Sequence, residues 1–298
     1  MARLTSAATV AAPSSAGFAQ NFSIEATRPN AAEIAALAEI LPRATPVYFS
    51  AVPTIEPHEL VVAATSLRRA GLEPVVHIAA RRVRAESDLA DLLGRLRGEA
   101  DVTRLLVIGG DVDTLGPFPD ALSVIQKGHL REAGIEEIGI GAYPEGHPRI
   151  APGRLEAALD EKLAASAAQG LRAHIVSQFS FSPERILAWL KQLRACGVAR
   201  PVKVGMAGPT SMPALLRYAR RCGVAASLRG LMKGSGGTLI GQVVGNVGPD
   251  RIIATLSAAG GLGDIAPHYF SFGCTLETAR YACEAAHGKL GASRAMAQ

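Results

Sequence analysis

Two acidic residues stand near the ends of short apolar runs, where a carboxyl group could take part in proton or hydrogen-bond chemistry. Glu25 lies in FSIEATRPN, shortly before a proline, and Asp111 follows LLVIGG. An enclosed carboxyl can hold a proton near neutral pH and deliver it as a general acid. A carboxylate that stays ionised can accept two N–H donors from a heterocycle. Each residue also has a structural interpretation, since Glu25 could pair with Arg28 and Asp111 could cap a turn.

Two further polar side chains interrupt apolar runs. His77 follows EPVV, and Gln178 lies in IVSQFSF. A histidine on a buried strand is either a hydrogen-bonded core residue or a ligand contact, and the sequence leaves both open. The primary amide of Gln178 offers a donor and an acceptor together, which suits recognition of the edge of a heterocyclic base. Ser50 and Phe270 occupy comparable positions at the ends of PVYFSAV and PHYFSF.

The segment AYPEGHP, residues 142–148, is the most specific local motif. The proline after Tyr143 holds that residue extended, so an apolar strand runs directly into a tight loop. Tyr143 and His147 then project from the same loop. An ordinary proline-rich turn would account for the prolines, but it does not require Tyr and His together.

The elements that must position these residues follow from the apolar rhythm. Short β-branched runs alternate with longer helical patterns, and Gly or Pro marks most junctions. Strands are expected at 22–27, 46–52, 73–79, 104–110, 137–143, 173–181, 202–207 and 267–272. Helices are expected at 31–41, 57–70, 86–98, 119–132, 152–168, 183–196, 211–222 and 276–287, with extra helix between Cys222 and Pro267.

Eight βα units in succession predict an α/β fold, a closed (βα)8 TIM barrel that forms one domain over residues 21–298. An open doubly wound sheet is the alternative, but such sheets usually contain fewer strands. Residues 1–20 are rich in Ala and Ser and are expected to form a flexible arm rather than a targeting peptide. In a TIM barrel the carboxyl ends of the strands surround one site, so the polar residues above should converge there.

Composition narrows the class of protein. Hydrophobic residues make up 48% of the chain, and no apolar stretch approaches the length of a membrane-spanning helix, which predicts a soluble cytoplasmic protein. The net charge of +5 is scattered, which favours a small anionic ligand over nucleic acid. The four cysteines contain no CxxC pair and no nearby His at metal spacing, so no zinc site is expected.

On these motifs the chain resembles the methylenetetrahydrofolate reductase family. Members of that family are flavin-dependent (βα)8 enzymes that interconvert 5,10-methylene- and 5-methyltetrahydrofolate with a reduced nicotinamide. The resemblance covers about residues 20–287 and depends most on YPEGHP and on the Gln-Phe-x-Phe of VSQFSF. It implies an oxidoreductase of one-carbon metabolism that uses FAD and NADH or NADPH, acts on tetrahydrofolate and serves methionine biosynthesis.

The resemblance also implies a role for each matched residue. Glu25 would be the catalytic acid and would contact the substrate, while Asp111, Gln178 and Phe270 would bind the folate. Asp111 would in addition tune the flavin. The remaining implied flavin contacts are His77, Gly110, Tyr143, His147, Glu156 and Lys162. Arg280 is expected near the barrel mouth, where it would meet the anionic folate tail.

Three positions depart from the family pattern, all at flavin contacts. Gly109 replaces the arginine of the family's Arg-Gly-Asp strand end, and Val52 stands where a threonine is usual. Met212 falls near the position of an aromatic residue that in the family shields the flavin face. A lost arginine removes a charge-assisted contact to phosphate. FAD is therefore expected to bind weakly or to be absent.

Two alternatives share the fold. One is direct hydride transfer between NAD(P)H and the folate without flavin, and the other is a non-catalytic protein that presents methyl-folate to a methyltransferase. The presence of Glu25 favours an enzyme, because binding alone does not need a proton donor. The sequence leaves open the direction of the reaction and the existence of a homo-oligomer.

Overall fold

Eight parallel strands close into a barrel in chain order, with β1 paired to both β2 and β8. The computed structural model describes residues 15–49, 56–210, 212–221, 224 and 249–289. The strands are β1 Ser23–Ala26, β2 Pro46–Phe49, β3 Glu73–Ala79, β4 Arg104–Ile108, β5 Glu137–Ala142, β6 Arg172–Ser177, β7 Val202–Ala207 and β8 Ile265–Phe270. The expected single-domain (βα)8 barrel is confirmed.

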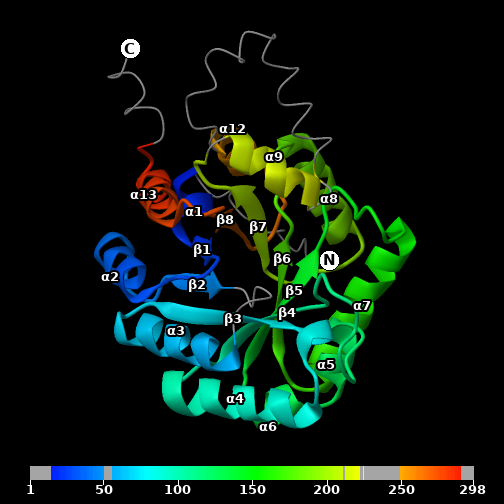
Figure 1. The fold of residues 1–298 in the computed structure, drawn as a ribbon. Helices are drawn as coiled ribbons and strands as arrows, with labels where there is room; N and C mark the ends of the chain where they lie inside the picture. Colours follow the sequence, from blue (N-terminus) through cyan, green and yellow to red (C-terminus); the bar gives the residue numbers. More distant parts are fainter. Residues whose placement is uncertain (1–14, 50–55, 211, 222–223, 225–248, 290–298) are drawn as a thin grey trace, which may run out of the picture.

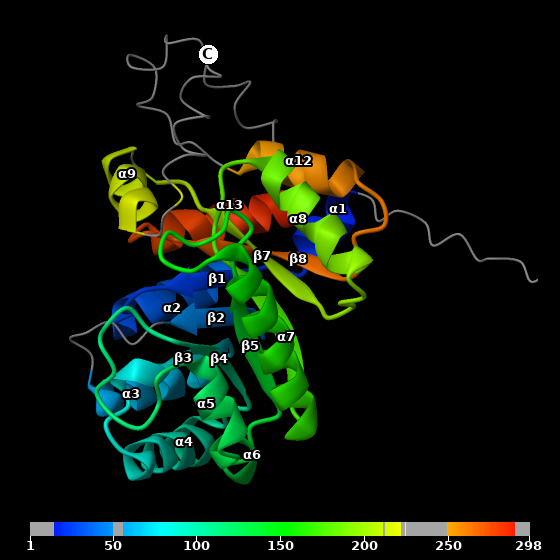
Figure 2. The ribbon, with the colours of Figure 1, turned by 90° about the vertical axis from the view of Figure 1, so that its right-hand side faces the viewer.

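Helices surround the strands on the outside of the barrel, as Figures 1 and 2 show. Several begin at a proline or behind a side-chain cap. The side chains of Asn30 and Ser182, for example, accept hydrogen bonds from backbone N–H groups in the first turns of α2 and α8. The helices are α1 Ser15–Gln20, α2 Ala31–Ile40, α3 Pro57–Arg69, η1 Ala80–Arg82, α4 Glu86–Ala100, α5 Ala121–Gln126, α6 His129–Glu132, α7 Pro152–Ala168, α8 Pro183–Ala195, α9 Met212–Arg221, α12 Asp250–Ala258 and α13 Thr275–Ala286.

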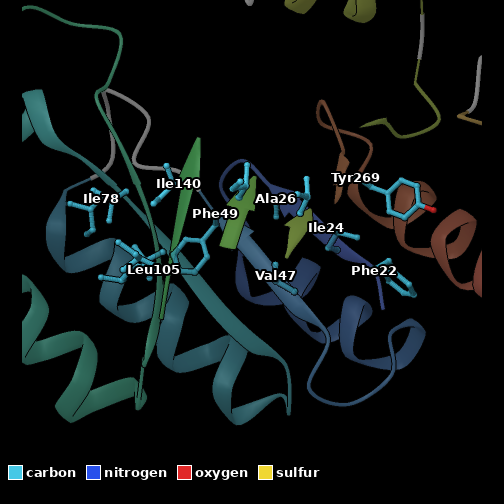
Figure 3. Packing of buried hydrophobic residues seen from close by; sticks show 14 of the residues in the cluster. Phe22, Ile24, Ala26, Val47, Phe49, Ile78, Leu105, Ile140 and Tyr269 are labelled. Carbon is cyan, nitrogen blue, oxygen red and sulfur yellow. The ribbon is translucent and has the colours of Figure 1, made fainter. Parts of the chain in front are cut away.

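The main hydrophobic core lies between the strands and the helices. Alternate strand residues point outward into it, as Figure 3 shows for Ile24, Val47, Phe49, Leu105 and Ile140, and all five are buried. Because both faces of a parallel sheet are covered, the strands read as nearly continuous apolar runs, which is why they stand out in the sequence.

The inward face of the barrel is unusually polar in its lower and middle layers. TIM barrel interiors are commonly filled by branched aliphatic side chains. Here Tyr48, His174 and His268 are buried, and the Tyr48 hydroxyl lies 2.8 Å from His174 Nε2. The other ring nitrogen of His174, Nδ1, lies 2.8 Å from Glu137 Oε1. A chain of polar contacts therefore runs through the barrel interior beneath the strand ends.

Several expected boundaries are corrected. Residues 15–20 form the helix α1 instead of a flexible arm, because Phe18 and Ala19 are buried and α1 packs against α12 and α13. The single helix expected over 119–132 is two helices, since Gly128 adopts a left-handed φ of 82° between α5 and α6. The strand expected at 173–181 ends at Ser177. Residues 1–14 lie outside the described residues.

The segment between Cys222 and Pro267 was expected to add extra helix, and α12 lies within it. The rest of that segment up to residue 248, apart from Val224, lies outside the described residues. Within the described ranges, none of the helices is both long and apolar enough to cross a membrane.

Candidate functional site

A cavity of about 1200 Å³ opens at the carboxyl ends of the strands and extends outward between α7 and α8. Most of the residues singled out in the sequence line it, although they come from six different strands or the loops that follow them, and from α7. The lining residues among them are Glu25, His77, Gly110, Asp111, Tyr143, His147, Glu156, Lys162, Gln178 and Phe270. The barrel therefore brings the candidate residues together, as expected for strand ends in this fold.

Glu25 lies at the floor of the cavity, on the inward face of β1. Its side chain retains only 18% exposure. Burial raises the pKa of the Glu25 carboxyl, and the nearby His77 opposes this shift. The acid form of Glu25 is thereby favoured, which is the state a proton donor needs.

Two residues that the sequence did not single out support Glu25 from below. His268 Nε2 lies 3.6 Å from Glu25 Oε2, and His268 Nδ1 lies 2.9 Å from the Ser23 hydroxyl. Burial, followed by the charges of Lys203 and His174, lowers the pKa of His268 to about 3. His268 is therefore a neutral imidazole near pH 7, and it adds no positive charge that would lower the pKa of Glu25.

His77 borders the cavity beside Glu25, with a nearly buried ring. Burial lowers its pKa, and the charge of Glu25 acts in the opposite direction. Its Nε2 has no hydrogen-bond partner among the described residues. Because buried polar atoms are nearly always hydrogen-bonded, this nitrogen is suited to contact a bound ligand.

Asp111 lies at the rim, just beyond Gly110, which has a left-handed φ of 94°. Its side chain is 47% exposed, and its Oδ1 lies 2.6 Å from Nη2 of Arg82 in η1. Arg81, the neighbouring residue of η1, also lines the cavity. Arg81 and Arg82 therefore belong to the cavity wall, because η1 lies against the segment that follows β4.

The loop after β5 carries Tyr143 and His147, whose rings pack edge to face with centroids 5.1 Å apart. His147 Nδ1 accepts a hydrogen bond from the Arg149 backbone, and partial burial lowers the His147 pKa. Lys162 on α7 points back toward this loop, with Nζ 3.5 Å from the Gly141 carbonyl oxygen, and burial lowers its pKa. Glu156, one and a half turns earlier on α7, accepts a hydrogen bond from Gln192 on α8.

Aromatic rings form the opposite wall of the cavity. Phe179 packs against Phe270 and Phe272, at centroid distances of 5.4 and 4.9 Å, and Phe272 packs against Tyr218 of α9 at 4.6 Å. Gln178 precedes this cluster, and its side-chain Oε1 accepts a hydrogen bond from the Phe179 backbone. A planar ring could lie against this wall and meet the Gln178 amide at its edge.

One expected site residue does not reach the cavity. Arg280 is exposed on α13 and is not among the residues that line it. The expectation placed Arg280 at the barrel mouth because it follows the last strand. The structure directs that turn of α13 to the outer surface instead. Ser50 and Val52 lie outside the described residues, as does the side chain of Met212.

The residues missed by sequence reasoning share one signal. Ser23 and His268 each lie two positions before an inward residue, Glu25 and Phe270, and therefore face the same side of their strands. Counting back by two from each strand end would have found both. Among the described residues, no group of three or more His, Cys, Asp or Glu side chains could hold a metal ion.

No protein-family model matches the chain. In three dimensions it is similar to a protein from Clostridium thermocellum that binds two copies of 5-methyl-5,6,7,8-tetrahydrofolic acid. That likeness has a TM-score of 0.50 at 11% sequence identity and covers 90% of this chain and 94% of the other. The match to a conserved protein of unknown function from Enterococcus faecalis covers 64% of this chain and 49% of the other chain, with 13% identity and a TM-score of 0.37. At such identities the likeness to the first protein establishes the fold.

Proposed function

We propose that the protein binds a reduced folate and interconverts 5,10-methylenetetrahydrofolate and 5-methyltetrahydrofolate by proton and hydride transfer. The observation that carries this proposal is the buried, acid-favouring carboxyl of Glu25 at the floor of a cavity that Asp111 and Gln178 also line. The structurally similar protein from C. thermocellum binds 5-methyltetrahydrofolate, which supports a reduced folate as the ligand class.

Glu25 supplies the proton. Its acid form donates to the bridging nitrogen of methylenetetrahydrofolate, the bond from that nitrogen to the methylene carbon breaks, and an electrophilic iminium remains. Hydride then adds to the methylene carbon and forms the methyl group. Each turnover consumes one proton and one hydride and leaves Glu25 as a carboxylate. In the reverse direction that carboxylate accepts the proton, so one residue serves both directions.

Asp111 and Gln178 orient the pterin. A carboxylate at the rim can accept two N–H donors from the pterin edge, and the Gln178 amide provides a donor and an acceptor beside the aromatic wall. Holding the ring in one orientation would bring the bridging nitrogen within reach of Glu25. Orientation of this kind accounts for a large part of the rate enhancement in many enzymes.

The hydride donor fits the other half of the cavity. Basic side chains gather there, contributed by Arg81, Arg82, Arg149, Arg154 and Lys162. They suit a phosphate-bearing cofactor, and Tyr143, His147 and Lys162 would hold FAD there. When bound, reduced FAD or a nicotinamide would supply the hydride. Arg81 brings a positive charge beside Gly109, which would partly offset the loss of the arginine at that position.

A coupled assay tests the proposal. Purified protein is incubated with methylenetetrahydrofolate and NADH or NADPH, with and without added FAD, while nicotinamide absorbance and 5-methyltetrahydrofolate are measured. One methyl-folate should form for each nicotinamide oxidised, and the dependence on FAD distinguishes flavin-mediated from direct transfer. A protein that binds the folate but turns over in neither direction under any of these conditions would contradict the proposal.

A second function, binding of methyl-folate without turnover, is favoured by one observation. The similar protein from C. thermocellum binds two copies of the methylated folate. Isothermal titration with 5-methyltetrahydrofolate would give the stoichiometry for this chain. Two sites together with no turnover in the coupled assay would support the binding function.

A further inference from the structure

The carboxylate of Asp111 lies at the rim of the cavity, where its side chain is 47% exposed. An exposed side chain can occupy several rotamers, so contacts with neighbouring groups are needed to hold the carboxylate in one orientation. Recognition of a ligand edge by two parallel hydrogen bonds requires such an orientation.

Arg82 provides that contact from a different element. Its Nη2 lies 2.6 Å from Asp111 Oδ1, and the Arg82 side chain is only 17% exposed. The short distance and the opposite charges make this a charge-assisted hydrogen bond, which is stronger than a neutral one. A carboxylate has about four lone-pair sites, so the contact with Arg82 at Oδ1 does not by itself use up its capacity to accept hydrogen bonds.

Arg82 is itself held in place, because η1 and the loop after β4 are joined by backbone bonds. Arg81 N donates to the Gly109 carbonyl oxygen at 3.0 Å, and Leu115 N donates to the Arg81 carbonyl oxygen at 2.9 Å. The Arg81 Nε donates to the Pro119 carbonyl oxygen at 2.8 Å. The two segments also pack closely, since a Cβ on Gly116 would lie 2.3 Å from the Arg84 carbonyl oxygen.

We propose that Arg82 is a positioning residue that holds Asp111 in the orientation needed for ligand recognition. The assignment of the ligand as a folate rests on the proposed function, whereas the coupling between the two side chains does not. Arg82 acts through Asp111, and the rigid pairing of η1 with the β4 loop transmits this orientation to the cavity rim.

A double-mutant cycle tests this role. The variants are Arg82→Met, Arg82→Lys, Asp111→Asn and the double variant Arg82→Met/Asp111→Asn. Arg84→Met is the matched control, since Arg84 is exposed on the same segment and does not line the cavity. Titration with 5-methyltetrahydrofolate should show about tenfold weaker binding for Arg82→Met. Arg82→Lys should recover part of the loss, and Arg84→Met should stay within about twofold of wild type.

The double variant distinguishes a positioning role from an independent contact. If Arg82 acts through Asp111, the double variant should bind no more than about twofold more weakly than Asp111→Asn alone. A double variant whose loss equals the product of the two single losses would overturn the proposal.

A ligand-free measurement keeps this inference separate from the proposed function. The carboxyl carbon of Asp111, followed by NMR in folded protein, should titrate at higher pH in Arg82→Met than in wild type, because an adjacent cation favours the carboxylate. An unchanged titration would contradict the role of Arg82. Failure of the wild-type protein to bind 5-methyltetrahydrofolate would remove the folate assignment, and the titration would still decide whether Arg82 controls Asp111.

Discussion

At the scale of single residues, the environment of each carboxyl group suggests its role. Glu25 is enclosed at the cavity floor beside the neutral imidazole of His268, whereas Asp111 is half-exposed at the rim beside a guanidinium. Burial favours the acid form of Glu25, and the position of Asp111 at the rim suits a hydrogen-bond acceptor. Two carboxyl groups in one cavity are thus suited to different tasks, one as proton donor and one as hydrogen-bond acceptor.

Replacing Glu25 by Gln should keep folate binding within a few-fold of wild type and lower turnover about a hundredfold or more, because the amide cannot donate an acidic proton. The pKa of Glu25 is raised, and the proposed mechanism uses its acid form, so wild-type turnover in the methyl-forming direction should fall as the pH rises through that pKa. Steady-state kinetics across pH measures both effects. Glu39→Gln, an exposed change on α2, is the control, and a variant at Glu25 that keeps wild-type turnover would remove this residue from the mechanism.

Replacing Asp111 by Asn exchanges an acceptor for a donor opposite the N–H edge of the pterin. One hydrogen-bonded pair becomes donor against donor, so the affinity for folate should fall by about 1–3 kcal/mol. Calorimetric titration with 5-methyltetrahydrofolate measures this loss. Unchanged affinity in a folded variant would exclude Asp111 from pterin recognition.

At the scale of elements, the ends of the strands and the short segments after them decide what the cavity can bind. η1 follows β3 and lies against the end of β4, so it supplies positive charge where β4 itself has Gly109. The aromatic wall comes instead from the segment after β6, the end of β8 and α9. A basic half and an aromatic half of one cavity therefore arise from opposite sides of the barrel.

The variant Gly109→Arg tests whether β4 can provide a further cation for FAD. The Gly109 backbone lies outside the left-handed region, and a Cβ there would meet no atom within 4 Å, so the side chain can be accommodated. A guanidinium beside the phosphates should tighten FAD binding by about 1–3 kcal/mol. Quenching of FAD fluorescence measures the affinity. As a control, Gly98→Arg adds the same charge on the exposed face of α4 and should leave the affinity for FAD unchanged.

At the scale of the whole molecule, a chain of polar contacts runs inside the barrel beneath the cavity. Glu137 at the start of β5 contacts His174, which contacts Tyr48 in the layer below Glu25. The imidazole of His174, with smaller contributions from Arg104 and Arg172, lowers the pKa of Glu137 to about 2. These contacts hold the buried imidazole of His174 in place beneath the cavity. They also make the free energy of unfolding depend on pH.

The pH dependence of stability follows from the sign of that shift. The pKa of Glu137 in the folded state lies below its ordinary value of 4.5, so its stabilising contribution is present above pH 4.5 and is lost as the pH falls toward about 2. Glu137→Gln should lower the free energy of unfolding by about 2 kcal/mol at pH 7. The difference from wild type should shrink below pH 4.5, as measured by denaturant unfolding at several pH values.

The exposed neighbour Glu136 provides the control for this experiment. Its carboxylate pairs with Arg172 at the surface, where ion pairs contribute little, so Glu136→Gln should change stability by less than about 1 kcal/mol. Equal effects of the two variants at pH 7 would show that the buried contact with His174 does not stabilise the barrel.

The sequence by itself determined the architecture and the convergence of the candidate site residues at one end of the barrel. Strand and helix periodicity are local properties, and a closed parallel barrel places every strand end on one rim, so Glu25, Asp111 and Gln178 could be predicted to converge. The boundaries were less predictable where a contact outside the segment decides them. The burial of Phe18 orders α1 in this way.

Only the tertiary structure decided which side chains meet. Ser23 and His268 are 245 positions apart, yet closure of the barrel between β1 and β8 places them in contact beneath Glu25. Arg82 meets Asp111 because η1 lies against the segment after β4, whereas Arg280 is exposed on α13 and does not line the cavity. A side chain's direction and partner depend on how the elements pack around it, and this information is not contained in the local spacing of residues.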